Sequence, residues 1–328
     1  MDIARELGIS KSTVSRALSG DTSNVKAETL QKIMKTAHRM GYHRNDLAVH
    51  LRQQRTHNIG IIIPEIITTF YMTFINEVQA ILRKQGYKVM IAISSENPKQ
   101  ERENLLMMEQ LRVDGILMSV CDKDQNVDLY NKVIERGIPI VFFDRTVEGV
   151  QASQVRMDDY IMAFFMVEAL LRKGYKHILH IPGPAYIRNS RERQRGYRDA
   201  LEKFHVAYQA QDILQPALSA EEGSRVMEQY LEKNIPFDAV FGFTETAVLG
   251  AKSTLQKHKM RIPDDVALCC ISGTALATLV HPQLTAVEQP IGEMARESCR
   301  LLMEHLADNN KKTEEIALRG ETVVREST

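Results

Sequence analysis

The chain has 328 residues, of which 44% are hydrophobic and 26% charged, which fits a globular protein with a small domain and roughly two larger ones. It has no leader-like start and no apolar run of the roughly 18 residues that a membrane-spanning helix needs, so we expect a cytosolic protein without a membrane partner. The net charge is zero, but residues 1–55 hold ten Lys and Arg against five Asp and Glu, a net +5 that leaves −5 for residues 56–328. This asymmetry points to phosphate contact at the N-terminal region.

The first predicted structure is a helix-turn-helix over Asp2 to Ser19. Gly8 supplies a permissive backbone for the turn, and Ser10 is suited to cap the second helix. Small and apolar side chains recur at helical spacing where two crossed helices would touch. The predicted buried positions are Ile3, Ala4 and Leu7 in the first helix and Val14 and Leu18 in the second.

The other side chains of the second helix are polar and can donate hydrogen bonds to base edges and phosphates. Arg16 suits bidentate contact with guanine. The positions expected to read bases are Lys11, Ser12 and Arg16, and those expected to touch phosphate or cap the helix are Ser10, Thr13 and Ser15. Double-stranded DNA is the partner that this pattern favours, and the alternative is an ordinary helical hairpin with a solvated polar face.

A third helix is predicted from Lys26 to Met40, ended by Gly41. Its apolar face is expected to consist of Leu30, Ile33, Met34 and Ala37. Three short helices make a small, complete domain, which favours DNA binding over a simple hairpin.

The run from DIARELGISKSTVSRALSG through NDLAVHLRQQRTHNIGIIIP resembles the N-terminus of the lac repressor (LacI) family of bacterial transcription regulators. Further family landmarks follow in the same order, so that the resemblance covers essentially the whole chain: VDGILMS, GIPIVFFDR, SRERQRGYRDAL, DAVFGF, IPDDVAL and HPQLTAVEQPIGEMA. The resemblance implies a DNA-binding headpiece at 1–44, a hinge helix and linker at 45–57, and an effector-binding and dimerisation core at 58–328.

The predicted hinge helix, Asn45 to Gln54, is too short to be stable alone in water. In the family that it resembles, this helix orders on operator DNA, pairs with its dimer mate and inserts a leucine into the minor groove. Leu51 matches that leucine, and Ala48 is a further expected DNA-binding position. The alternative is that Leu51 packs on the headpiece, and His50 departs from the small residue usual before it.

From Asn58 onward, short apolar runs alternate with amphipathic helices, which predicts parallel sheets covered by helices. The expected fold is α/β: an all-α headpiece and a two-lobed core like that of periplasmic binding proteins. The resemblance implies an N-lobe at about 58–157 and 290–318, a C-lobe at about 158–289 and 319–328, and crossings near 155–160, 287–290 and 318–321. A small-molecule effector would bind between the lobes, beyond the carboxyl ends of the strands.

Two pairs of residues at strand ends are candidates for that cleft. Phe70 and Tyr71 follow the first strand and match a family pair that contacts effector, although aromatic rings could equally stabilise a helix start. Asp144 and Arg145 end the strand VFFD, where a polar pair is more useful at a cleft than in a core.

Arg193 matches the arginine that most consistently reaches the ligand in this family. Asn189 and Phe241 match further pocket positions. The alternative for Arg193 is a solvated helix charge like those expected of its neighbours Arg188, Arg191 and Arg195.

The cleft also departs from the family pattern. Ser272 replaces the aspartate that usually grips ligand hydroxyls or amines, and Thr244 with Glu245 replaces a familiar Asn-Asp pair. These changes put an ordinary sugar in doubt, and the arginine-rich helix start favours an anionic sugar derivative, since guanidinium groups hold anions bidentately.

We therefore predict a homodimeric, ligand-responsive repressor that binds a pseudo-palindromic operator. The alternatives are a small-molecule binding protein without a DNA role and a sugar-modifying enzyme. No nucleophile elbow, phosphate loop or paired metal ligands occur, so we expect neither catalytic residues nor a cofactor. His177 and His180 are expected to be structural, and the four cysteines to pack as reduced thiols, with a vicinal redox pair at Cys269 and Cys270 as the alternative.

Overall fold

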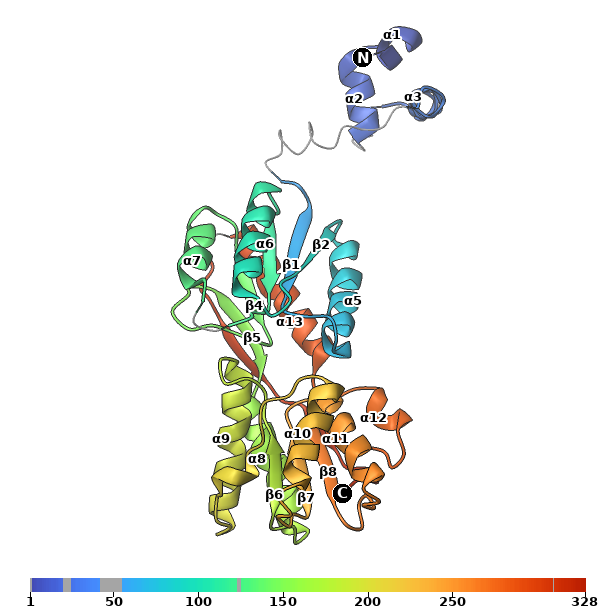
Figure 1. Ribbon diagram of the computed structural model, residues 1–328. Helices are drawn as coiled ribbons and strands as arrows, with labels where there is room; N and C mark the ends of the chain where they lie inside the picture. Colours follow the sequence, from blue (N-terminus) through green and yellow to red (C-terminus); the bar gives the residue numbers. More distant parts are fainter. Residues whose placement is uncertain (1, 20–24, 42–54, 123–124, 309) are drawn as a thin grey trace. The chain divides into compact units, whose positions relative to one another are not determined.

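The computed structural model describes residues 2–19, 25–41, 55–122, 125–308 and 310–328, and it divides into two compact units, Met1–Thr56 and His57–Thr328 (Figure 1). Within these described ranges, no helix has the length and hydrophobicity needed to cross a membrane. The predicted hinge positions Ala48, His50 and Leu51 lie outside the described residues.

The described residues of the first unit form helices α1 (Asp2–Leu7), α2 (Lys11–Ser19) and α3 (Ala27–Arg39). Gly8 has a positive φ of 63°, and the Ser10 hydroxyl accepts the Thr13 amide at 3.0 Å, so the predicted turn and cap are confirmed. The buried core consists of Ile3, Ala4, Val14, Ala17, Ile33 and Ala37.

One of the predicted core positions in this unit is wrong. Met34 is 53% exposed, because the buried face of α3 runs through Ile33, Thr36 and Ala37 and leaves position 34 outside. On α2, Ala17 is buried beside Val14, and Leu18 is half-buried against the same core.

The second unit contains two sheets, each the centre of a lobe. The N-lobe sheet is parallel throughout, in the order β10-β5-β4-β3-β1-β2. Its strands are β1 (Asn58–Ile63), β2 (Lys88–Ile93), β3 (Gly115–Met118), β4 (Ile140–Phe143), β5 (Ser153–Met157) and β10 (Glu315–Leu318). The helices around it are α5 (Thr69–Lys84), α6 (Pro98–Gln110), α7 (Val127–Glu135) and α13 (Ile291–Ala307).

The C-lobe sheet has the order β11-β9-β8-β7-β6 and is parallel except for β11. Its strands are β6 (Ile178–Ile181), β7 (Ala239–Gly242), β8 (Ala267–Gly273), β9 (Thr285–Glu288) and β11 (Glu321–Val323). Its helices are α8 (Asp159–Arg172), α9 (Arg188–Lys203), α10 (Ala220–Leu231), α11 (Glu245–Lys257), α12 (Leu276–Leu279) and the 3-10 turn Ala210–Asp212.

Alternation along the strands explains why helices cover both faces of each sheet. In β1, Ile61 packs with α5 and α13, while its neighbour Ile62 packs with α6 and α7. In β8, Cys269 packs with α8 and α9, while Cys270 packs with α10 and α11. Successive side chains point to opposite faces, so each strand is buried on both sides, and the predicted α/β fold is confirmed.

The helix pair α10 and α11 packs closely because each helix has a glycine at the contact. A methyl group on Gly223 would overlap the carbonyl of Ala247, and one on Gly250 would overlap the carbonyl of Ala220. The two glycines therefore set how closely these helices approach.

The chain passes between the lobes three times, from β5 to α8, from β9 to α13, and from β10 to β11. The predicted ranges 155–160, 287–290 and 318–321 overlap these three connections. The connections lie near one another, because β5 pairs with β10 in the N-lobe and β9 pairs with β11 in the C-lobe.

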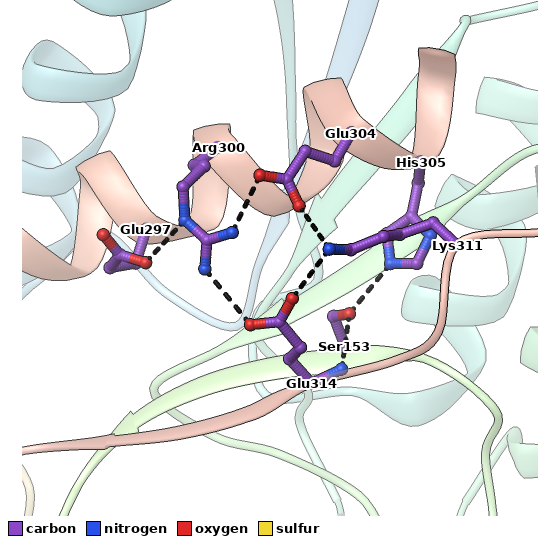
Figure 2. A network of polar contacts seen from close by, with 7 residues as sticks. All are labelled: Ser153, Glu297, Arg300, Glu304, His305, Lys311 and Glu314. Atoms are coloured by element: carbon purple, nitrogen blue, oxygen red, sulfur yellow. Dashed lines mark hydrogen bonds and ion pairs between the residues drawn. The ribbon is translucent and has the colours of Figure 1, made fainter. Parts of the chain in front are cut away.

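Hydrogen bonds and ion pairs connect the segment before β10 to the C-terminal part of α13 (Figure 2). Arg300 contacts Glu297, Glu304 and Glu314, with nitrogen–oxygen distances of 2.9, 2.9 and 3.3 Å. Beneath these half-buried groups, the Nε2 atom of the His305 ring lies 2.8 Å from the Ser153 hydroxyl. The network therefore has a partly solvated outer layer and a buried inner hydrogen bond.

Candidate functional site

A cavity of about 360 Å³ lies beyond the carboxyl ends of β1, β4, β7 and β8 and is lined by residues of both lobes. This is the place where ligands bind in open parallel sheets, and the volume is sufficient for a small organic ligand. Six of the seven predicted effector-binding residues line it: Phe70, Tyr71, Asp144, Asn189, Arg193 and Ser272.

Phe70 and Tyr71 lie in the first turn of α5 and are almost completely buried. Their rings meet edge to face, with centroids 5.0 Å apart, and Phe70 also stacks on Phe74. The two interpretations that the sequence left open are thus combined, because the rings pack at the start of α5 and line the cavity as well.

Asp144 follows β4 with a positive φ of 57° and is buried. Its carboxylate accepts hydrogen bonds from the Tyr71 hydroxyl at 2.9 Å and from the Asn189 side-chain amide of α9 at 3.0 Å. Burial raises the pKa of Asp144 to about 6. Since Asn189 belongs to the other lobe, this carboxylate joins the two lobes directly.

Arg145 does not pair with its neighbour Asp144. Its guanidinium donates two hydrogen bonds, both of 2.9 Å, to the carboxylate of Glu96. The side chain is buried and lines the cavity with its charge already paired.

Arg193 is not a solvated helix charge, since it is only 2% exposed. Its Nε donates to Asp159 at 2.7 Å and its terminal nitrogen donates to the carbonyl of Phe243 at 2.6 Å. The guanidinium carbon also lies 4.3 Å from the centroid of the Phe243 ring. Arg193 is therefore fixed in place, while Arg191 and Arg195 are exposed and do not line the cavity.

Phe241 does not line the cavity, so this predicted position requires correction. It lies within β7, where its ring stacks on His180 and Tyr197 beneath helices α8 and α9. The strand ends at Gly242, and Phe243 is the aromatic residue that reaches the cavity.

The three residues that depart from the family pattern all line the cavity. Ser272 has a positive φ of 69°, a strained conformation for a residue with a side chain, as expected at a ligand site. Thr244 caps α11 by accepting the Ala247 amide at 3.2 Å. Glu245 accepts both the backbone amide and the hydroxyl of Thr274, and so fixes the loop after β8.

Sequence reasoning missed three acidic residues of the cavity lining, Glu65, Glu96 and Glu222. Glu65 lies just beyond β1, so the strand-end argument could have found it. Glu222 was detectable only as part of a capping box with Ser219, which marks a helix start and not a cleft.

The second helix of the small unit presents the predicted DNA-binding face. Lys11, Ser12, Ser15 and Arg16 are exposed, while Val14 and Ala17 are buried on the opposite side. The Ser10 hydroxyl contacts the hydroxyls of Ser12 and Thr13 at 2.8 and 2.7 Å as well as capping the helix. The exposed side chains can therefore contact base edges and phosphates.

The cysteines and histidines outside the cavity are packed into the protein core or lie at its surface. All four cysteines are buried free thiols, and burial raises the pKa values of Cys269 and Cys270. His180 is buried with its Nδ1 3.0 Å from the Phe241 carbonyl, whereas His177 is exposed. In the part of the chain that the structure describes, no cluster of three or more metal-ligating side chains occurs.

A small helical domain with an exposed basic helix, followed by a two-lobed α/β unit with a cavity between the lobes, defines a ligand-responsive DNA-binding regulator. Residues 1–45 match the family "Bacterial regulatory proteins, lacI family", and residues 56–318 match "Periplasmic binding proteins and sugar binding domain of LacI family". The chain belongs to the LacI family of transcriptional regulators.

Two curated relatives and one solved structure show how far the similarity extends. The chain is 30% identical to Catabolite control protein A of Priestia megaterium, over 95% of this chain and 92% of that protein. It is 28% identical to the HTH-type transcriptional regulator DegA of Bacillus subtilis (strain 168), over 100% and 97% of the two chains. The structure of the transcriptional regulator CelR-cellobiose complex matches with a TM-score of 0.76 and 25% identity, over 99% of this chain and 98% of that one.

Family membership decides between the three functions that the sequence left open. The chain is a DNA-binding transcriptional regulator with an effector-binding domain, and the family consists of regulators and not enzymes. A small-molecule binding protein without a DNA role and a sugar-modifying enzyme are therefore both excluded as its principal function.

Proposed function

We propose that the protein is a homodimeric repressor that binds a pseudo-palindromic operator and is controlled by a small molecule in the cavity between its lobes. The observation that carries this proposal is that one cavity is lined from both lobes. A ligand that contacts both lobes stabilises one arrangement of them, and so changes the population that can bind DNA.

Base reading is assigned to Lys11, Ser12 and Arg16, and phosphate contact to Ser15. These assignments are supported by the exposure of all four side chains on one face of α2. Ser10 and Thr13 are hydrogen-bonded to each other, which favours a capping role that positions the helix on the DNA backbone. Ala48 and Leu51 are assigned to the central minor groove, on the family resemblance.

Homodimerisation is supported by apolar side chains exposed on the larger unit. Met72 of α5 and Ile91 of β2 are 48% and 50% exposed, and Leu279 of α12 is 77% exposed. In Figure 1, α5, β2 and α12 all lie on the right-hand side of this unit. A two-fold contact along that side would cover these residues, and sedimentation of the full chain tests it.

The effector is proposed to be a sugar or sugar derivative, since the cavity is flanked by aromatic rings and hydrogen-bonding groups and a related regulator is solved with cellobiose. An anionic derivative is not favoured. Arg188, Arg191 and Arg195 do not line the cavity, while Arg145 and Arg193 are already paired with Glu96 and Asp159. The cytoplasm, at the chromosome, is the proposed location, as operator binding requires.

Selection of genomic DNA fragments by the purified full chain, at defined salt, tests the proposed operator binding. We expect a palindrome that Arg16→Ala binds about tenfold to a hundredfold more weakly, as for the loss of a bidentate base contact. Lys35→Ala is the matched control, because it removes one exposed positive charge from α3 of the same unit. Equal losses in both variants, or binding without sequence preference, would contradict this assignment.

A further inference from the structure

The charged side chains around the cavity are mainly acidic. Five carboxylates line it, those of Glu65, Glu96, Asp144, Glu222 and Glu245. Two guanidiniums line it, those of Arg145 and Arg193, and no Lys or His does so among the described residues. The charges on the lining therefore amount to −3 when all these groups are ionised.

Both arginines already have carboxylate partners. Arg145 is paired bidentately with Glu96, and Arg193 is paired with Asp159, which lies behind the lining. A ligand anion would have to compete with an existing buried ion pair at either position. The two pairs are neutral as units, so the remaining four carboxylates determine the charge that a ligand meets.

These four carboxylates have only uncharged hydrogen-bond donors among the described residues. Asp144 accepts from Tyr71 and Asn189, and Glu245 accepts from Thr274. Glu65 accepts hydrogen bonds from backbone amides and a hydroxyl just before α5. Glu222 accepts hydrogen bonds from backbone amides just before α10. The four carboxylates are therefore hydrogen-bonded, but no positive charge in the described part of the chain is hydrogen-bonded to them to balance their negative charges.

The four carboxylates are divided equally between the lobes. Glu65 and Asp144 belong to the N-lobe, and Glu222 and Glu245 belong to the C-lobe. Like charges on two lobes repel across a cavity that partly excludes water, and a cation between them would be attracted by both. The Phe70 and Phe243 rings belong to the same lining, and the Phe243 ring already has the Arg193 guanidinium over one face.

We propose that the effector carries a positive charge, as a polar amine of the amino-sugar class, and that its ammonium group draws the acidic faces of the two lobes together. This assignment rests on the proposed function, because it specifies the ligand of the same cavity. A neutral sugar lacks the charge that would balance the four carboxylates, and a phosphorylated sugar adds to the repulsion.

Calorimetry of the full chain with three matched sets of sugars tests the proposal. Each set holds a neutral hexose, its 2-amino derivative and its 6-phosphate, based on glucose, galactose and mannose. We expect the amino member of at least one set to bind at least tenfold more tightly than the neutral member, and the phosphate to bind most weakly. Tightest binding by a neutral or phosphorylated member, or no binding in any set, would overturn the charge assignment.

A charge variant on α10 supplies the matched control. Glu222→Gln retains the capping box, which accepts either residue, and removes one cavity charge. Glu221→Gln removes the same charge from an exposed position on the same helix. We expect Glu222→Gln to weaken the amino sugar at least tenfold and the neutral sugar less than twofold, and Glu221→Gln to change neither. If Glu222→Gln is unstable, Glu65→Gln is used with the same expectation. Equal weakening of the binding of the amino sugar and of the neutral sugar would contradict the proposal.

Operator binding, measured with and without each sugar, separates this inference from the proposed function. A neutral sugar that binds best and shifts operator affinity would retain effector control and overturn the positive charge. An amino sugar that binds with the expected preference without shifting operator affinity would support the charge assignment and contradict effector control.

Discussion

The two lobes have similar sheets covered by helices, but the buried aspartates Asp144 and Asp159, one in each lobe, have partners of different kinds. In the N-lobe, Asp144 and Glu101 are buried carboxylates that accept hydrogen bonds from uncharged donors. In the C-lobe, Asp159 is buried with the guanidinium of Arg193, and His180 is buried with no partner for its Nε2 among the described residues. One architecture thus tolerates both neutral networks and ion pairs, and the two kinds should respond differently to substitution and to pH.

The largest difference is expected when one partner of the C-lobe ion pair is removed. Asp159→Ala leaves the Arg193 charge buried and unpaired, which should lower the free energy of unfolding by about 3–5 kcal/mol. Asp144→Asn in the N-lobe replaces a carboxylate that has only neutral partners, and should cost about 1–2 kcal/mol. Urea unfolding of both variants measures the contrast.

The double variant Asp159→Leu with Arg193→Met is the control for that experiment. It removes both charges and keeps apolar volume, so it should be more stable than Asp159→Ala alone. A double variant that is less stable than the single one would show that volume, and not the unpaired charge, dominates at this position.

The second difference concerns pH, and it has opposite signs in the two lobes. Burial lowers the pKa of His180 to about 4, below its unfolded value of about 6.5, so its contribution to stability is lost as pH falls from about 6.5 to 4. Burial raises the pKa of Asp144 to about 6, above its unfolded value of about 3.9, so its contribution is lost as pH rises from about 4 to 6. The two effects oppose each other in the same pH range.

Variants at these two positions separate the effects. Relative to wild type, His180→Phe should gain stability on going from pH 6.5 to 4, and Asp144→Asn should lose stability, each by up to about 3 kcal/mol. Unfolding of wild type and both variants at several pH values measures the differences. Differences of the same sign for the two variants would contradict the assignment of opposite shifts.

The third contrast lies within the N-lobe, between two buried serines. Ser153 contacts His305 and accepts the Glu314 amide at 3.0 Å, while the Ser298 hydroxyl has no partner among the described residues. Ser153→Ala should therefore cost about 1–3 kcal/mol, because it leaves buried groups unsatisfied, and Ser298→Ala should be neutral or stabilising. Thermal unfolding of the two variants compares the same chemical change, and equal costs would indicate that the hydrogen bonds contribute nothing net.

The alternation of apolar runs and helices was sufficient to predict the two sheets, and strand ends, together with the family match for Phe70 and Tyr71, placed Phe70, Tyr71 and Asp144 at the cavity. Both predictions depend on local periodicity, which a single sequence records directly. Phe241 was misplaced because the end of β7 decides which aromatic residue leaves the core, and that end is set by tertiary contacts.

The partners of the charged residues were not predictable. Arg193 is paired with a carboxylate 34 residues earlier in the chain, and Arg145 with one 49 residues earlier. Only the fold brings these groups together, so the sequence showed arginines that could hold an anion and gave no sign that carboxylates already occupied them. This is why the arginine-rich helix start favoured an anionic ligand, whereas the effector that we propose is cationic.

The smallest effect is expected at the outer layer of the network in Figure 2, although Arg300 has more carboxylate contacts than Arg193. The Arg300 side chain is 39% exposed, so water and salt screen its interactions, and Arg300→Met should cost less than about 1 kcal/mol. The cost should shrink further in high salt, whereas the cost of Asp159→Ala should hardly change, because that pair is buried. Urea unfolding at low and high salt measures both, and a salt-independent loss of several kcal/mol at Arg300 would mean that burial is not what separates strong ion pairs from weak ones in this protein.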